Sequence, residues 1–164
     1  MGKGTKHAGD WKMTTLKVAI DARNLFRHSV KIMRNERKFN PSNDFHGMTL
    51  ERIFNELLDL YLNTWDANRI NVVKRPERIN ERLSLQESAM RCVQRLLALF
   101  ELAKSQFHIE HGKFWNWMNM LVDVGKELSA WNKSDIERYV SNGKNTNNLG
   151  NQSGRKLNSA QVPT

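Results

Sequence analysis

Hydrophobic residues recur every three to four positions along most of this chain, and no segment sustains the alternation of hydrophobic and polar residues that is typical of a strand. The pattern predicts four helices, at about residues 15–38 and 49–68, from a start between 76 and 84 to about 107, and at about 112–131. We therefore expect an all-α protein, an antiparallel four-helix bundle, within residues 14–140. Residues 1–13 are expected to be a flexible basic segment, and residues 141–164 a disordered tail rich in Asn, Ser and Gly.

Two short motifs bear on where helices begin. The stretch SLQE at 84–87 has the form of a capping box, which would start the third helix at Ser84. Ile79 and Leu83 also fit an earlier start, anywhere after the proline at position 76. The stretch SDIE at 134–137 is expected to cap a short extra turn that reaches Val140.

Large aromatic side chains dominate the predicted core. The inward-facing residues of the second helix are expected to be Leu50, Ile53, Phe54, Leu57, Leu58, Tyr61 and Trp65. In the fourth helix, the stretch FWNWMNMLVDVGKELSAW places Trp117, Leu128 and Trp131 on one apolar stripe. Gly125 lies on the same stripe. Because a glycine inside a helix costs about 1 kcal/mol relative to alanine, we interpret it as a position where a neighbouring helix approaches closely.

Some apolar residues of the fourth helix fall off this stripe. Trp115 is the largest of them, and Met120 and Val122 are near it in the sequence. Four helices in one chain would leave such residues exposed, and exposed aromatic and methionine side chains often mark an interface. We therefore expect the protein to oligomerise. Scattered surface apolar residues, which are common, are the alternative interpretation.

Positive charge is concentrated in particular segments. The chain has 26 Lys and Arg against 17 Asp and Glu, a net charge of +9. Residues 1–38 have a net charge of +7, residues 39–66 of −4, and residues 67–82 of +3. This balance favours a polyanionic partner, with nucleic acid ahead of a membrane.

A basic row on the first helix is the clearest candidate for binding nucleic acid. Arg27, Lys31, Arg34 and Lys38 are spaced four, three and four residues apart, which puts them on one helix face. A solvated helix face is the alternative. The full set of candidate nucleic-acid-binding residues is Lys17, Arg27, Lys31, Arg34, Arg37, Lys38, Lys74, Arg75, Arg78, Arg91 and Arg95.

Signals for catalysis or metal binding are weak. The chain has no Gly-rich phosphate loop, no C-x-x-C and no H-E-x-x-H. His108, Glu110 and His111 cluster before the fourth helix, where such residues usually solvate a helix end. We expect no catalytic residue, no metal and no cofactor. The single cysteine, Cys92, excludes an internal disulfide and, with no membrane span or signal peptide in the pattern, favours the cytoplasm.

Three segments of the chain share a family pattern: FNPSNDFHGMTLERIFNELLDLYL, QRLLALFELAKS and LVDVGKELSAWNKS. The matching positions are Phe39, Pro41, Thr49, Leu50, Arg52, Ile53, Arg95, Leu96, Leu97, Leu102, Ala103, Gly125, Lys126, Leu128 and Trp131. In these positions the chain resembles the Avd-like four-helix-bundle family, the accessory variability determinants of diversity-generating retroelements, which are related to bundle proteins encoded in ribosomal RNA intervening sequences.

This resemblance implies a specific role. Members of the family form homopentameric barrels without an active site, and they bind a reverse transcriptase and its template RNA during mutagenic cDNA synthesis. A basic bundle of the ribosomal intervening-sequence type remains an alternative, which the absence of a neighbouring reverse transcriptase gene would favour. Two further alternatives are a protein-only adaptor that binds through Trp115 and Met120, and an enzyme that uses His108, Glu110 and His111.

Overall fold

The computed structural model describes residues 16–34 and 44–141, and in that part of the chain every regular element is helical. The elements are α1 (Lys17–Met33), α2 (Asp44–Arg69), η1 (Pro76–Arg78), α3 (Ile79–Phe107), α4 (His111–Asp135) and η2 (Ile136–Ser141), of which η2 is a π-helix that continues α4. The prediction of an all-α chain with four main helices is confirmed.

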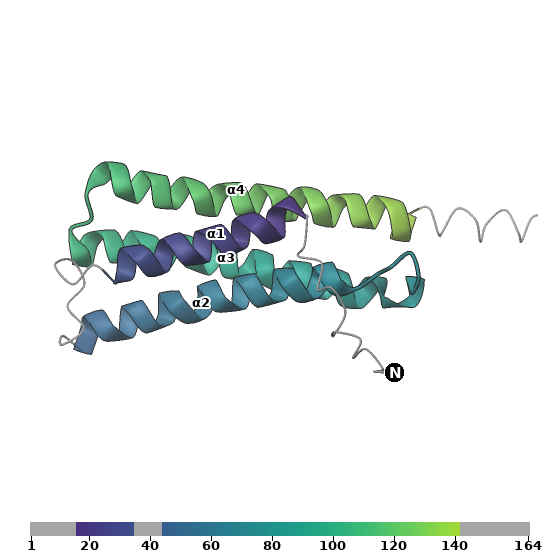
Figure 1. Ribbon diagram of the computed structural model, residues 1–164, viewed down its shortest axis with the longest axis horizontal. Helices are drawn as coiled ribbons and strands as arrows, with labels where there is room; N and C mark the ends of the chain where they lie inside the picture. Colours follow the sequence, from purple (N-terminus) through teal and green to yellow (C-terminus); the bar gives the residue numbers. More distant parts are fainter. Residues whose placement is uncertain (1–15, 35–43, 142–164) are drawn as a thin grey trace, which may run out of the picture.

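The four helices run side by side, and each is antiparallel to the next in the chain (Figure 1). α1 packs against α2 and α4, and α3 packs against the same two helices, so the four surround one core. α1 is the shortest, with 17 residues against 25 to 29 in the others. It therefore covers only part of the length of α2 and α4 (Figure 1).

A stacked aromatic pair lies at the centre of the core. The ring centroids of Phe100 and Trp117 are 3.7 Å apart, and neither side chain is exposed. The indole Nε1–H of Trp117 donates a hydrogen bond of 2.6 Å to Oγ of Ser29, which in turn donates to the carbonyl oxygen of Leu25 at 2.8 Å. A buried indole N–H needs such a partner, so Ser29 on α1 orients Trp117 on α4.

The expected close approach at Gly125 is present in the structure. A Cβ atom at this position would lie 3.1 Å from Cγ1 of Val93, tighter than an ordinary van der Waals contact. α3 and α4 therefore pack together here because residue 125 has no side chain. Leu128 is fully buried, whereas Trp131 is only half-buried and packs against the edge of the core.

Helix ends differ from the sequence prediction. α1 ends at Met33, and residues 35–38, where the first helix was expected to continue, lie outside the described residues; α2 begins at Asp44, before the predicted Thr49. Of the two starts considered for the third helix, the earlier one is confirmed: α3 begins at Ile79, and the capping box at Ser84 is wrong because residues 84–87 lie in the helix interior. Pro76 explains the earlier start: it opens the 3-10 turn η1, which leads directly into α3, and proline is well suited to a first helical turn.

The helical extension predicted to reach Val140 is present as η2, but residues 134–137 do not cap it, because α4 continues through Asp135 into η2 without a break. Asp135 is instead a buried member of a polar cluster. Both of its carboxylate oxygens accept from Arg82, at 2.7 Å from Nε and 3.1 Å from Nη2. Gln86 donates to the same carboxylate at 2.7 Å and accepts from Asn132 at 3.0 Å. Arg82 also donates to the carbonyl oxygen of Ile70, so this cluster joins α3, the end of α4 and the chain that follows α2.

Cys92 is buried between α2 and α3, and we expect it to be unreactive in the folded protein. Burial, and then the negative charge of Glu56, raise the pKa of the Cys92 thiol from 9.0 to about 11. Because only the thiolate reacts with disulfide reagents, its reaction with such a reagent at pH 8 should be at least about 100-fold slower in the folded than in the unfolded chain.

The same pKa shift has a defined effect on stability. A thiol whose pKa is raised on folding contributes stability that is complete below pH 9.0 and is lost as the pH rises towards 11. Wild type should therefore lose more stability than Cys92→Ala between pH 8 and pH 11, measured by chemical denaturation. If the folded and unfolded chains reacted with the disulfide reagent at equal rates, this result would contradict the burial of the Cys92 thiol.

Candidate nucleic-acid interface

The outer face of α1 carries cations that no carboxylate of the described residues neutralises. Arg27, Lys31 and Arg34 are all exposed. None of them forms an ion pair with a carboxylate in the described ranges 16–34 and 44–141. Like charges on one helix face repel one another, so an anion bound here would relieve an unfavourable arrangement. Arg37 and Lys38, the other predicted members of the row, lie outside the described residues.

Two side chains of the row line separate grooves at the C-terminal half of α1. Arg34 lines a shallow hollow of about 340 Å³ between α1 and α2. Lys31 lines a pocket of about 430 Å³ between α1 and the beginning of α4, together with His28 and Lys113. Burial, and then the charge of Lys31, lower the pKa of His28 below its usual 6.5. His28 is therefore neutral near pH 7 and adds no positive charge to the row.

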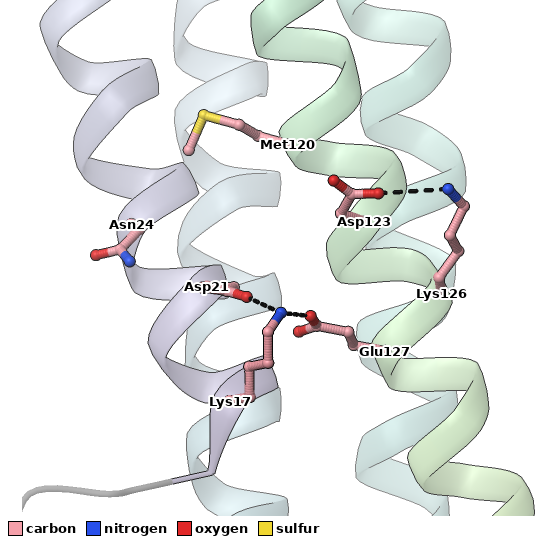
Figure 2. A pocket seen from close by; sticks show the side chains of 7 residues that line it. All are labelled: Lys17, Asp21, Asn24, Met120, Asp123, Lys126 and Glu127. Atoms are coloured by element: carbon pink, nitrogen blue, oxygen red, sulfur yellow. Dashed lines mark hydrogen bonds and ion pairs between the residues drawn. The ribbon is translucent and has the colours of Figure 1, made fainter.

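Lys17 is held by carboxylates at the other end of α1. Figure 2 shows its Nζ between Asp21 on α1, at 2.7 Å, and Glu127 on α4. They line a pocket of about 480 Å³ that also contains Asp123 and the side chain of Met120 (Figure 2). Three acidic residues around one pocket disfavour a phosphate. Lys17 therefore differs from Arg27, Lys31 and Arg34, although all four were among the candidate nucleic-acid-binding residues.

The basic connection between α2 and α3 lies far from the row. Lys74 and Arg75 are exposed and have no ion-pair partner among the residues that the structure describes, but Arg78 is paired with Glu81 at 2.6 Å. Figure 1 places this connection at the opposite end of the bundle from the C-terminal end of α1. From Leu50, beside Arg34, to the end of α2 is about 30 Å at 1.5 Å per residue.

Arg91 and Arg95 occupy a third place, on α3, which packs against α2 and α4 rather than α1. The guanidinium of Arg95 lies 3.4 Å from Oε1 of Glu56, and Arg52 lies 3.0 Å from the same oxygen. Arg91 donates to Oγ of Ser88 at 2.9 Å. The structure thus distributes the nine predicted basic residues that it describes over separate surfaces, and the row at α1 brings together three that form no ion pair with a described carboxylate.

Glu56 is a buried charge that the sequence analysis did not single out. Its side chain is only 3% exposed. The spacing contains the signal, because Glu56 follows Ile53 by three residues and precedes Leu60 by four, which places it on the buried stripe. Its negative charge holds Arg52 and Arg95 at the α2–α3 surface.

The predicted interface residues Trp115 and Met120 are not brought together. Trp115 is 43% exposed, and Nζ of Lys104 on α3 lies 5.4 Å from its ring centroid. Met120 instead faces α1 in the pocket of Lys17 (Figure 2). Residues five positions apart are rotated by about 140° around a helix, so the two side chains occupy opposite flanks of α4.

The prediction that Phe54 faces inward is wrong, and the difference reveals an aromatic surface. The buried stripe of α2 contains Ile53, Leu57 and Leu60, whereas Phe54 is 40% exposed. Together with Phe26 of α1 and with Tyr61 and Trp65 of α2 it forms the aromatic row of the α1–α2 groove. Ring centroids are 5.5 Å apart for Phe54 and Phe26, 6.4 Å for Phe26 and Tyr61, and 6.2 Å for Tyr61 and Trp65.

Within 16–34 and 44–141, no group of three or more His, Cys, Asp and Glu side chains is arranged to hold a metal ion. His108, Glu110 and His111 accordingly form no such group, and Glu110 pairs with Lys113 at 2.9 Å. No helix in these ranges combines the length and the apolar character that a membrane crossing requires.

Comparisons with known proteins give no match: no family model, no curated protein and no solved structure is similar to this chain.

Proposed function

We propose that this protein is a non-catalytic nucleic-acid-binding bundle. The observation that carries the proposal is the row Arg27, Lys31 and Arg34, three exposed neighbouring cations that form no ion pair with a described carboxylate. Lys17, Arg78 and Arg95, by contrast, are each paired with Asp or Glu. A protein that neutralises phosphates with such side chains releases condensed counterions, which drives binding with little dependence on sequence. The net charge of +9 extends the attraction beyond this row.

The biological setting of the proposal comes from the resemblance to the Avd-like family. On that ground we propose that the chain assists a reverse transcriptase of a diversity-generating retroelement, binds its template RNA and cDNA, and assembles as a homopentamer. The all-helical fold and the tight α3–α4 packing at Gly125 agree with this proposal, because Gly125 is among the matching positions. Copurification with the product of a neighbouring reverse transcriptase gene tests the partner directly.

Replacing Arg27, Lys31 and Arg34 together by Gln should weaken RNA binding and reduce its dependence on salt. The slope of log K against log salt concentration is about −0.9 per phosphate neutralised on duplex and about −0.7 on a single strand. Losing three contacts should therefore flatten the slope by roughly two to three units for each engaged subunit. Fluorescence anisotropy with a labelled RNA, titrated at several salt concentrations, measures both quantities.

The matched control is the triple Gln variant of Lys17, Lys126 and Lys133. It removes the same charge, but from exposed side chains that pair with Asp21, Asp123 and Glu137. The control should keep most of the salt slope, and light scattering on all samples should report one mass, five times 19.1 kDa if the pentamer forms. Equal slopes for wild type and the α1 variant would show that the row is only a solvated face.

A further inference from the structure

We infer that the α1–α2 groove binds unpaired nucleobases of a single-stranded polynucleotide, with one base stacked on Phe54 in the hollow beside Arg34. This inference rests on the proposed nucleic-acid function and specifies it further: the phosphates of the strand contact the row on α1, and its bases contact the aromatic row. Three features of the groove support this inference: its exposed aromatic rings, the shape and polarity of the hollow, and the charged side chains along its edge.

The aromatic row is a continuous surface rather than a set of isolated rings. Its members follow one another at centroid separations of 5.5 to 6.4 Å, and all of them are at least partly exposed. From Phe54 to Trp65 the row extends about 16 Å along α2 at 1.5 Å per residue. Successive bases of a single strand stack on aromatic side chains in this way, with little regard to sequence.

The hollow at one end of the row has the lining that a base needs. Its walls are apolar, from Val30 and Met33 on α1 and from Leu50 and Phe54 on α2. Its rim is polar, with the guanidinium of Arg34 on one helix and the carboxylate of Glu51 on the other.

These two rim charges do not form an ion pair with each other or with another described residue. A hydrogen-bond donor and an acceptor thus remain available across one apolar hollow. The edge of a nucleobase presents acceptors that suit arginine and donors that suit a carboxylate.

The charge along the groove favours a polynucleotide over a protein segment. Arg23 and Arg27 belong to α1 and Arg34 is its C-cap, and no described carboxylate forms an ion pair with any of them. The Nε atom of Arg23 is also buried without a hydrogen-bond partner. Aromatic rings beside a line of arginines combine stacking with neutralisation of phosphates. A duplex hides the faces of its bases, so only an unpaired strand can use both.

The test compares Phe54→Leu with Phe54→Tyr in the full chain. Leucine keeps an apolar side chain but removes the ring, whereas tyrosine keeps the ring. The probes are an RNA of about 20 nucleotides without self-complementarity, DNA of the same sequence, and the corresponding duplex. Because stacking contributes about 1–3 kcal/mol per base, Phe54→Leu should weaken single-strand binding at least about fivefold and leave duplex affinity unchanged. Phe54→Tyr should bind like wild type.

Trp115→Leu is the matched control, because Trp115 is as exposed as Phe54, at 43% against 40%, but lies outside the groove. Trp115→Leu should leave the affinity for each of these probes unchanged. The inference is overturned if Phe54→Leu binds single strands as wild type does, or if it loses as much affinity for the duplex as for single strands. A change in mass by light scattering would also overturn it, because it would indicate that Phe54 contacts another protein chain. If wild type binds no probe in a salt-dependent way, the proposed function itself fails, and this result is distinct from the others.

Discussion

Asp135→Ala should lower the free energy of unfolding by about 3–5 kcal/mol, because it leaves a buried guanidinium without its counterion. The Asp135 side chain is 4% exposed and that of Arg82 is 16% exposed, and two hydrogen bonds join them. Gln86 would lose an acceptor at the same time. Against a typical total of about 5–15 kcal/mol, this loss is large. Denaturation followed by circular dichroism, at one fixed protein concentration, measures it.

The double variant Arg82→Met with Asp135→Ala separates the free-energy cost of the unpaired charge from the other losses of stability. Removing both partners leaves no uncompensated charge, so the double variant should be more stable than Asp135→Ala alone. Lys133→Ala, which removes an exposed charge two residues away, should change stability by no more than about 0.5 kcal/mol. If Asp135→Ala also changed stability this little, the cluster would not hold the end of the bundle together.

Trp117→Ala should lower the free energy of unfolding by a similar amount, about 3–5 kcal/mol, through a different mechanism. The substitution opens a cavity beside Phe100 and leaves the hydroxyl of Ser29 without the indole N–H that it accepts. Trp115→Ala is the control, because Trp115 is 43% exposed and should lose less than about 1 kcal/mol.

Trp117→Phe tests the role of the indole hydrogen bond. It keeps most of the ring but cannot donate to Ser29, so its cost should fall between those of Trp117→Ala and wild type. Thermal and chemical unfolding of the same samples should rank the variants alike. A Trp115→Ala variant that is less stable than Trp117→Ala would contradict the assignment of these two neighbouring tryptophans to surface and core.

The helical repeat was readable from the sequence wherever a residue's own spacing decided its environment. Trp117, Leu128 and Gly125 share one stripe of α4, and the structure places them at the core or against a neighbouring helix. Spacing predicted burial less reliably for residues at the edge of an apolar stripe. Phe54 and Ile53 are adjacent in the sequence, yet only Ile53 is buried, because the direction from which α1 and α3 approach α2 decides which flank is covered.

The sequence by itself determined the class of fold and the excess of positive charge, because both depend on the order of residues along one chain. It also determined that Arg27, Lys31 and Arg34 share a face, since a helix relates residues three and four apart. Only the tertiary structure decided which charges stay unpaired. Lys17 meets Glu127 and Arg82 meets Asp135 across 110 and 53 residues of chain, and such contacts depend on the packing of whole helices, which no local pattern encodes.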